Sequence, residues 1–365
     1  MISSVIQRVV VMALLVGLLS ASPALGMIVH SDGAEPNDHP SNNVIGRWGS
    51  NSSCVVIGPN LVVTTTHQGY SSYVQIGGEY YTTHYVPEMY GGATGSADVR
   101  VAWLSNGGQR VDLTEWVGID LGSPVGQVVT MGGYGKGRGA ELETFSGKPY
   151  GYAWASEGNQ NLRWAMNRVD YLDGGLTRAD FDDLGRGDAI SLYEGIPAEY
   201  DSGGGWFVDD DGTWKLVSLT NGAEHAGIDE AWYRNSVTGN LDPDVMYGLY
   251  LQHHYDWLQP FIDMPYPTSG DTDLSGAVDI QDLGNLADKY GTTSGAYWWW
   301  GDFDGDRDVD LMDLGNLANN YESGVGAAVD TGYLAPIAEG PPTVPEPTSL
   351  ALLALAGLAL GKRRP

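Results

Sequence analysis

The chain has 365 residues and a formal net charge of −28, from 46 acidic and 18 basic side chains. This charge excludes binding to nucleic acid or to anionic membrane surfaces by simple charge attraction. The length allows one large and one small domain, and the 52 glycines favour turn-rich β structure. The single cysteine, Cys54, allows no disulfide within the chain, so stability must come from the core or from bound ions.

Residues 1–26 have the pattern of a secretory signal. Arg8 supplies the positive charge, and residues 9–19 are almost entirely apolar. Ala24-Leu25-Gly26 then places small residues where signal peptidase cuts. A transmembrane anchor, the alternative, would need about 20 apolar residues. We therefore expect an exported protein whose first residue is Met27.

A histidine and an aspartate each lie next to a predicted buried strand. Residues 54–66 are typical of a β-hairpin, and His67 comes directly after its second arm, where a general base would have rigid support. Residues 97–104 alternate as a strand with Asp98 at its head. A carboxylate there could orient a histidine and stabilise its charged form. Asp112 is a competing candidate; we prefer Asp98 because the apolar alternation follows it.

Residues 199–205, Glu-Tyr-Asp-Ser-Gly-Gly-Gly, suit neither a helix nor a strand interior. They would allow a sharp turn that presents the Ser202 hydroxyl beside backbone N–H groups. A catalytic serine needs a neighbouring base and donors for the oxyanion. Taken alone, the segment would be read as a flexible Gly-rich loop, and the upstream His67 and Asp98 favour the catalytic interpretation.

His67, Asp98 and Ser202, in this order and with their flanking residues, resemble the three motifs of the trypsin/chymotrypsin-like serine proteases. The resemblance covers about residues 27–264 and implies an all-β domain of two six-stranded antiparallel barrels with a C-terminal helix. It implies that Ser202 attacks a peptide or protein substrate, His67 transfers the proton and Asp98 orients His67. The N–H groups of Tyr200 and Ser202 would form the oxyanion hole.

Three positions bear on how closely the chain follows that family. Tyr200 stands where the family has a glycine. Six residues before the serine is Ile196, which would favour an apolar or small substrate side chain. Many members insert a freed Ile or Val amine against the aspartate before the serine, here Asp201. Ile28 could supply that amine, but the expected cleavage leaves Met27 first.

Two acidic loops of identical spacing come next, the second beginning 31 residues after the first. Oxygen side chains occupy loop positions 1, 3, 5, 9 and 12, as in EF-hand-like Ca²⁺ loops, and each loop runs into the sequence Asp-Leu-Gly-Asn-Leu-Ala. The Ca²⁺ ligands that this spacing predicts are Asp271, Asp273, Ser275, Asp279 and Asp282 in the first loop, and Asp302, Asp304, Asp306, Asp310 and Asp313 in the second.

The two loops, over residues 269–322, resemble a small α-helical, EF-hand-like type I dockerin domain. The resemblance implies structural Ca²⁺ and a cohesin-like protein partner, and we expect the domain to be unfolded without metal. Arg307 replaces the glycine usual at position 6, which predicts a poorer turn or weaker binding in the second loop. Residues 265–268 and 323–343 would be linkers.

The last segment, residues 344–365, resembles a PEP-CTERM sorting signal. It has the triplet Pro345-Glu346-Pro347, an apolar stretch over residues 349–361 and a basic end at residues 362–364. The resemblance implies association with the envelope of a Gram-negative bacterium, at the outer cell surface or released from it. The whole chain therefore predicts a secreted serine endopeptidase that is tethered by its C-terminal modules. The alternative is a weakly active or inactive protease-like scaffold that serves binding or assembly.

Overall fold

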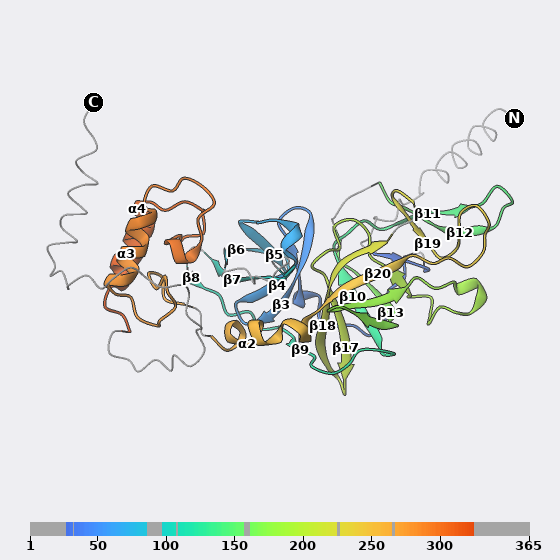
Figure 1. Cartoon of the computed structure of the whole chain (residues 1–365), viewed down its shortest axis with the longest axis horizontal. Coiled ribbons are helices and arrows are strands. Elements are labelled where there is room, and N and C mark those ends of the chain that lie inside the picture. The colour runs from blue at the N-terminus through green and yellow to red at the C-terminus, as the bar shows by residue number, and fades with distance from the viewer. Residues whose placement is uncertain are drawn as a thin grey trace, which may run out of the picture. The chain divides into compact units, whose positions relative to one another are not determined.

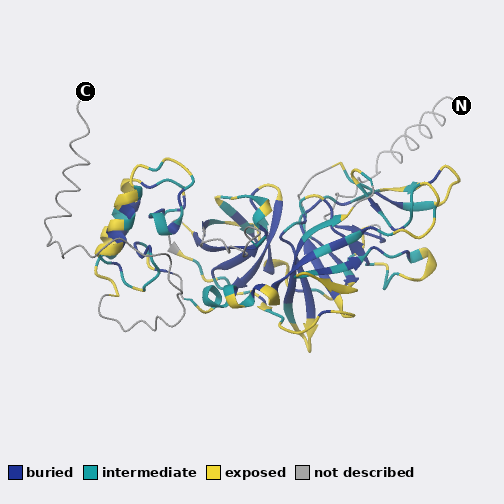
Figure 2. Ribbon diagram, viewed as in Figure 1, coloured by how far each residue is buried: buried dark blue, intermediate teal, exposed yellow. Residues whose placement is uncertain are grey.

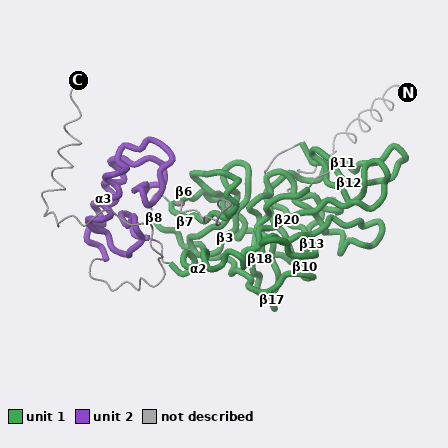
Figure 3. The backbone as a smooth tube through the Cα atoms, in the orientation of Figure 1, with its two compact units in different colours: residues 1–264 green, residues 265–365 purple. Residues whose placement is uncertain are grey.

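The computed structural model describes residues 27–31, 33–85, 97–106, 109–156, 161–224, 227–264 and 267–324. The expected secretory signal, the sorting signal and most of the second linker lie outside these residues. The chain divides into two compact units, residues 1–264 and 265–365 (Figures 1 and 3). The protein is mostly β-sheet with few helices, and no described helix is long and apolar enough to cross a membrane.

Six antiparallel strands of the first unit form a closed barrel, in the order β4-β3-β2-β5-β6-β7, with β4 paired to β7. Gly46 lies so close to Cys54 that a Cβ there would stand 2.7 Å from its sulfur. Cys54 is fully buried, as expected, and burial raises the pKa of its thiol. The strands are β2 (Ile45–Trp48), β3 (Ser52–Gly58), β4 (Leu61–Thr64), β5 (Tyr73–Ile76), β6 (Glu79–Tyr85) and β7 (Arg100–Asn106), and β7 also pairs with β8 (Gln109–Arg110).

A second sheet of the same unit runs in the order β13-β10-β17-β18-β20-β15-β14, with β9 beside β18. It bends until β13 approaches β15, where the Asn167 side chain donates a hydrogen bond of 2.9 Å to the Asp180 carbonyl. Figure 2 shows the strands of both sheets as largely buried. The strands are β9 (Gly118–Ile119), β10 (Val128–Gly133), β13 (Arg163–Arg168), β14 (Tyr171–Asp173), β15 (Leu176–Asp180), β17 (Gly205–Asp210), β18 (Thr213–Glu224) and β20 (Val245–Tyr250).

Smaller elements complete the first unit. Helix α2 (Tyr255–Asp263) follows the 3₁₀ turn η5 (Leu251–His254), near the end of the segment where the resemblance implies a C-terminal helix. Its Phe261 ring meets Trp103 of the barrel edge to face, with centroids 6.4 Å apart. The remaining elements are β1 (Ile28–Val29) paired with β16 (Gly195–Ile196), the sheet of β11 (Arg138–Glu143), β12 (Pro149–Trp154) and β19 (Glu230–Trp232), and the 3₁₀ turns η1 (Asn42–Val44), η2 (Thr66–Gln68) and η4 (Leu184–Arg186).

The second unit places each acidic loop before one helix. Helix α3 (Ile280–Lys289) and helix α4 (Leu311–Asn320) both begin with a capping box, made by Asp279 with Asp282 and by Asp310 with Asp313. The box occupies N–H groups that would otherwise lack partners, which explains why both helices begin at the same place in the repeat. Between them lies η6 (Trp298–Trp300), and the core consists of Val278, Leu283, Leu286, Trp298, Phe303, Val309 and Leu317.

Candidate active site and candidate metal loops

His67 and Asp98 meet because their strands are neighbours. His67 lies in η2, just after β4, and Asp98 lies just before β7, which pairs with β4 in the barrel. The His67 Nδ1 is 2.6 Å from Asp98 Oδ2, and the His67 backbone N–H donates to Oδ1 at 2.9 Å. When Nδ1 carries the proton, Nε2 is free to accept one, as a general base must.

The surroundings of Asp98 favour its charged form. Burial alone would raise its pKa, but hydrogen bonds from His67 and from the Thr66 hydroxyl hold that pKa below the ordinary value. The competing Asp112 points elsewhere, since its carboxylate is 2.8 Å from the Arg110 guanidinium and its side chain is 70% exposed. The structure therefore brings Asp98, and not Asp112, to His67.

Asn221 of β18 is a site residue that the sequence did not reveal. Its side-chain N–H donates to Asp98 Oδ2 at 2.5 Å, and its carbonyl oxygen accepts from the Ser202 hydroxyl at 3.4 Å. Asn221 thus touches two of the three predicted catalytic residues and connects the second sheet to the barrel that carries His67. One asparagine in a strand gives no sequence signal for this role.

The turn that carries Ser202 has its carbonyl groups bonded and two of its N–H groups unbonded. The Glu199 carbonyl accepts from the Lys136 N–H at 2.9 Å, and the Ser202 carbonyl accepts from the Ser53 N–H at 3.0 Å. The Ser53 hydroxyl donates to the Tyr200 carbonyl at 3.4 Å. Among the described residues, the N–H groups of Tyr200 and Ser202 have no hydrogen-bond acceptor. Such backbone N–H groups can bind an anion.

Tyr200 adopts the backbone conformation that a glycine would take. Its φ is 77°, in the left-handed region, and that of Gly203 is 79°. For a residue with a side chain this conformation costs about 1–2 kcal/mol. Only glycine fits at position 203, because a Cβ there would lie 2.2 Å from both the Ser53 carbonyl oxygen and the Thr64 hydroxyl. The tyrosine therefore does not force this turn into an extended conformation.

Asp201, next to the serine, is fully buried and faces the N-terminal segment. Its oxygens accept from the N–H groups of Gly135 at 2.7 Å, Ala198 at 2.9 Å and Met27 at 3.3 Å. Burial raises the pKa of Asp201 to about 7 despite these donors. A positive charge at the Met27 nitrogen would stabilise the carboxylate. Cleavage before Met27 would create that charge.

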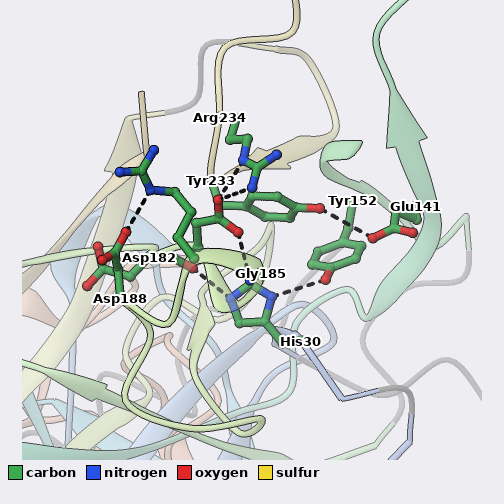
Figure 4. A network of polar contacts seen from close by, with 10 residues as sticks. His30, Glu141, Tyr152, Asp182, Gly185, Asp188, Tyr233 and Arg234 are labelled. Carbon is green, nitrogen blue, oxygen red and sulfur yellow. Dashed lines mark hydrogen bonds and ion pairs between the residues drawn. The ribbon is translucent and has the colours of Figure 1, made fainter. Parts of the chain in front are cut away.

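His30 anchors the segment that begins at Met27 (Figure 4). The ring lies between two partners, with Nδ1 3.0 Å from the Tyr152 hydroxyl and Nε2 2.7 Å from the Asp182 carbonyl. It also stacks on Phe181, with centroids 4.6 Å apart. Burial lowers the pKa of His30 to about 4, so the ring is neutral, with Nε2–H donating to the carbonyl.

Ile196 lies in the core, whereas the sequence resemblance predicted that it would face the substrate side chain. It is fully buried and pairs with Ile28 across the β1–β16 ladder. Its side chain belongs to the core of the second sheet. The apolar substrate preference expected from Ile196 therefore has no basis in this structure.

Carboxylate oxygens gather in both acidic loops of the second unit. Three groups have oxygens that all lie within 4.8 Å of one another: Asp271, Asp273 and Asp282; Asp302, Asp304 and Asp306; and Asp308, Asp310 and Asp313. Asp308 was not among the predicted ligands. Carboxylate oxygens are hard donors of the kind that Ca²⁺ prefers.

Two other predicted ligands of the first loop lie outside its carboxylate group. The Ser275 hydroxyl donates to the Ala277 carbonyl at 3.3 Å, and Asp279 caps α3 by accepting from the Gln281 N–H at 2.8 Å.

Burial, together with nearby carboxylates, raises the pKa of Asp271 and of Asp302 to about 7. A bound cation would offset the cost of holding these groups charged.

Arg307 does not disturb the second loop. Its φ is 71°, against 82° for Gly276 at the same position of the first loop. Position 6 therefore has the same left-handed conformation in both loops, and the arginine does not prevent this turn. The left-handed conformation still costs an arginine about 1–2 kcal/mol.

One family description matches the chain. It is the PEP-CTERM protein-sorting motif, at residues 343–364. The chain carries a PEP-CTERM sorting signal. This confirms the interpretation of residues 344–365 and marks a protein that is exported and sorted to the cell surface or extracellular space of a Gram-negative bacterium. A search of curated proteins finds no match.

Proposed function

We propose that the exported chain is a serine endopeptidase of the trypsin-like fold. The observation that carries the proposal is the joint arrangement of the site: Asp98 holds His67, Asn221 touches both Asp98 and Ser202, and the turn at Ser202 has two unbonded N–H groups. A nucleophile, a general base, a charged group that orients the base and an anion site are the parts that acyl transfer requires.

The two-barrel interpretation of the first unit rests on three features. The first sheet closes through β4 and β7, and the second bends until Asn167 of β13 bonds to the Asp180 carbonyl of β15. Helix α2 then packs on Trp103 of the first barrel through Phe261. Each feature agrees with the fold that the sequence resemblance implies.

In the proposed reaction, the Ser202 hydroxyl attacks the substrate carbonyl as His67 Nε2 takes its proton. The carbonyl oxygen becomes an oxyanion that the N–H groups of Tyr200 and Ser202 stabilise. His67 then returns the proton to the leaving amine, and water releases the acyl group by the same steps. Asp98 stabilises the charged imidazole throughout.

The substrate backbone would pair with the open edge of β18. β17 pairs with β18 only as far as Leu219, whereas β20 continues along the other side to Glu224. Within the described residues, no strand therefore pairs with positions 221–224 on the side that carries Ser202. An extended peptide can add to such an edge by main-chain hydrogen bonds.

Hydrolysis of unfolded casein by the protein beginning at Met27 tests the proposal. Ser202→Ala should reduce the rate by at least about 10³-fold, since it removes the nucleophile. Ser146→Ala, at an exposed turn, is the matched control and should leave the rate unchanged. Equal rates for wild type and Ser202→Ala would contradict the proposal.

For the second unit we propose a dockerin-like module that holds structural Ca²⁺ and binds a cohesin-like protein partner. Its carboxylate groups support the metal, and its exposed apolar side chains support the partner. Leu311 is 61% exposed and Met312 65%, at the start of α4, and Ile280 at the start of α3 is 39% exposed. Exposed apolar side chains mark a binding surface where they form one patch, and we propose that these three do so.

A further inference from the structure

We propose that Lys136 and Glu199 are positioning residues, which hold the peptide of Tyr200 with its N–H directed at the oxyanion. This inference rests on the proposed protease function. Their support would let a chain with tyrosine at this position keep a working anion site. A glycine could adopt the same conformation with no side-chain support.

A continuous set of contacts runs from Lys136 to the tyrosine. The Lys136 ammonium is 2.6 Å from Glu199 Oε2, and its backbone N–H donates to the Glu199 carbonyl at 2.9 Å. The charged Glu199 carboxylate also acts on the Tyr200 side chain and raises the pKa of its hydroxyl. The Glu199 carbonyl belongs to the same peptide as the Tyr200 N–H, so Lys136 holds that peptide through the main chain and also pairs with the Glu199 side chain.

Lys136 is itself well fixed. Its side chain is only 18% exposed, its ammonium lies 3.7 Å from Asp229, and it stands 5.7 Å from the centre of the Trp154 ring. The residue before it, Gly135, donates its N–H to Asp201. The same segment thus holds the serine turn on both sides of Tyr200. Because these contacts fix Lys136, its ammonium can hold Glu199 in one position, which a freely moving surface lysine could not do.

The strained conformation explains why this support matters. Tyr200 has a φ of 77°, and a tyrosine without its tether would spend more time in extended conformations. In those conformations the peptide plane turns and its N–H no longer meets the oxyanion. Losing one such donor completely lowers rates by about 10²–10³-fold. Partial loss of the aligned conformation should cost less.

The test measures the second-order rate at which a fluorophosphonate acylates Ser202 in the protein beginning at Met27. Lys136→Met removes the ammonium but keeps the backbone hydrogen bond, and should slow acylation about tenfold. Glu199→Ala should slow it similarly. Lys215→Met, which breaks the exposed Lys215–Asp210 ion pair, is the matched control and should have no effect.

A second substitution separates positioning from general structural damage. Glycine needs no tether, so Lys136→Met combined with Tyr200→Gly should label as fast as Tyr200→Gly alone. A double variant that stays as slow as Lys136→Met overturns the inference, as does a Lys136→Met variant that labels at the wild-type rate. If wild type itself does not label, the proposed protease function fails first.

Discussion

A protein that begins at Met27 is expected to hydrolyse peptides at least about 100-fold faster than one that retains a residue before Met27. The freed amine would be a cation 3.3 Å from Asp201 Oδ2, in a fully buried position. Removing one partner of a buried ion pair costs about 3–5 kcal/mol, which corresponds to about 100-fold or more. This loss of stabilising free energy would act on the turn that carries Ser202.

Rates of peptide hydrolysis by matched proteins, with and without one added N-terminal glycine, measure this effect. Asp201→Asn supplies the control, because in that background the added glycine should make little difference. If the chain is the proposed protease, export would then activate it, since removal of the signal creates the amine. Equal activity of the extended and unextended proteins would exclude this role for Met27.

The pH dependence of stability should also report the ion pair between the Met27 amine and Asp201. Without the amine, burial raises the pKa of Asp201 from 3.8 to about 7, so the folded extended protein holds this proton more tightly than the unfolded chain. Its stability should therefore fall as pH rises from about 4 to about 7. The protein beginning at Met27 should lack this fall, so thermal melting of the two forms should diverge toward pH 7.

Removing calcium is expected to unfold the second unit and leave the first folded. The carboxylates of Asp271, Asp273 and Asp282 lie within 4.8 Å of one another and would repel without a cation. At 100 times its dissociation constant, Ca²⁺ would stabilise each site by about 2.7 kcal/mol. Calorimetry of the full chain should show a separate transition that shifts to lower temperature in EDTA.

Single substitutions assign that calcium effect to the loops. Asp271→Ala should lower the calcium-dependent transition, since its carboxylate belongs to the first group. Asp288→Ala is the control, because that side chain is 73% exposed on α3 and lies outside the group. Identical calorimetric transitions with and without EDTA would sink the metal proposal.

Much of the framework was predictable from local patterns. The β-branched arms around residues 58–60 form β3 and β4. The repeated Asp-Leu-Gly-Asn-Leu-Ala lies within both helices of the second unit, and its Asp is the second member of each capping box. His67 and Asp98 could be paired because each stands at the end of a predicted strand. These features depend on neighbours in sequence, which a single chain reveals.

Contacts between distant segments could not be predicted in the same way. Asn221 and Ser53 act on the serine turn only because the two sheets meet there. His30 looked like any histidine near a terminus, and Ile196 entered the core because β16 pairs with β1. Tyr200 looked unfavourable by residue type, and only its φ of 77° shows that the turn accommodates it.

The most direct test is fluorophosphonate labelling of the protein beginning at Met27, with the modified residue located by peptide mass spectrometry. If His67 activates Ser202 as proposed, one adduct should form, on Ser202. His67→Ala should abolish labelling although Ser202 remains. A folded wild-type protein that takes up no label, or takes it up elsewhere, would contradict the protease proposal and favour a protease-like scaffold that serves binding or assembly.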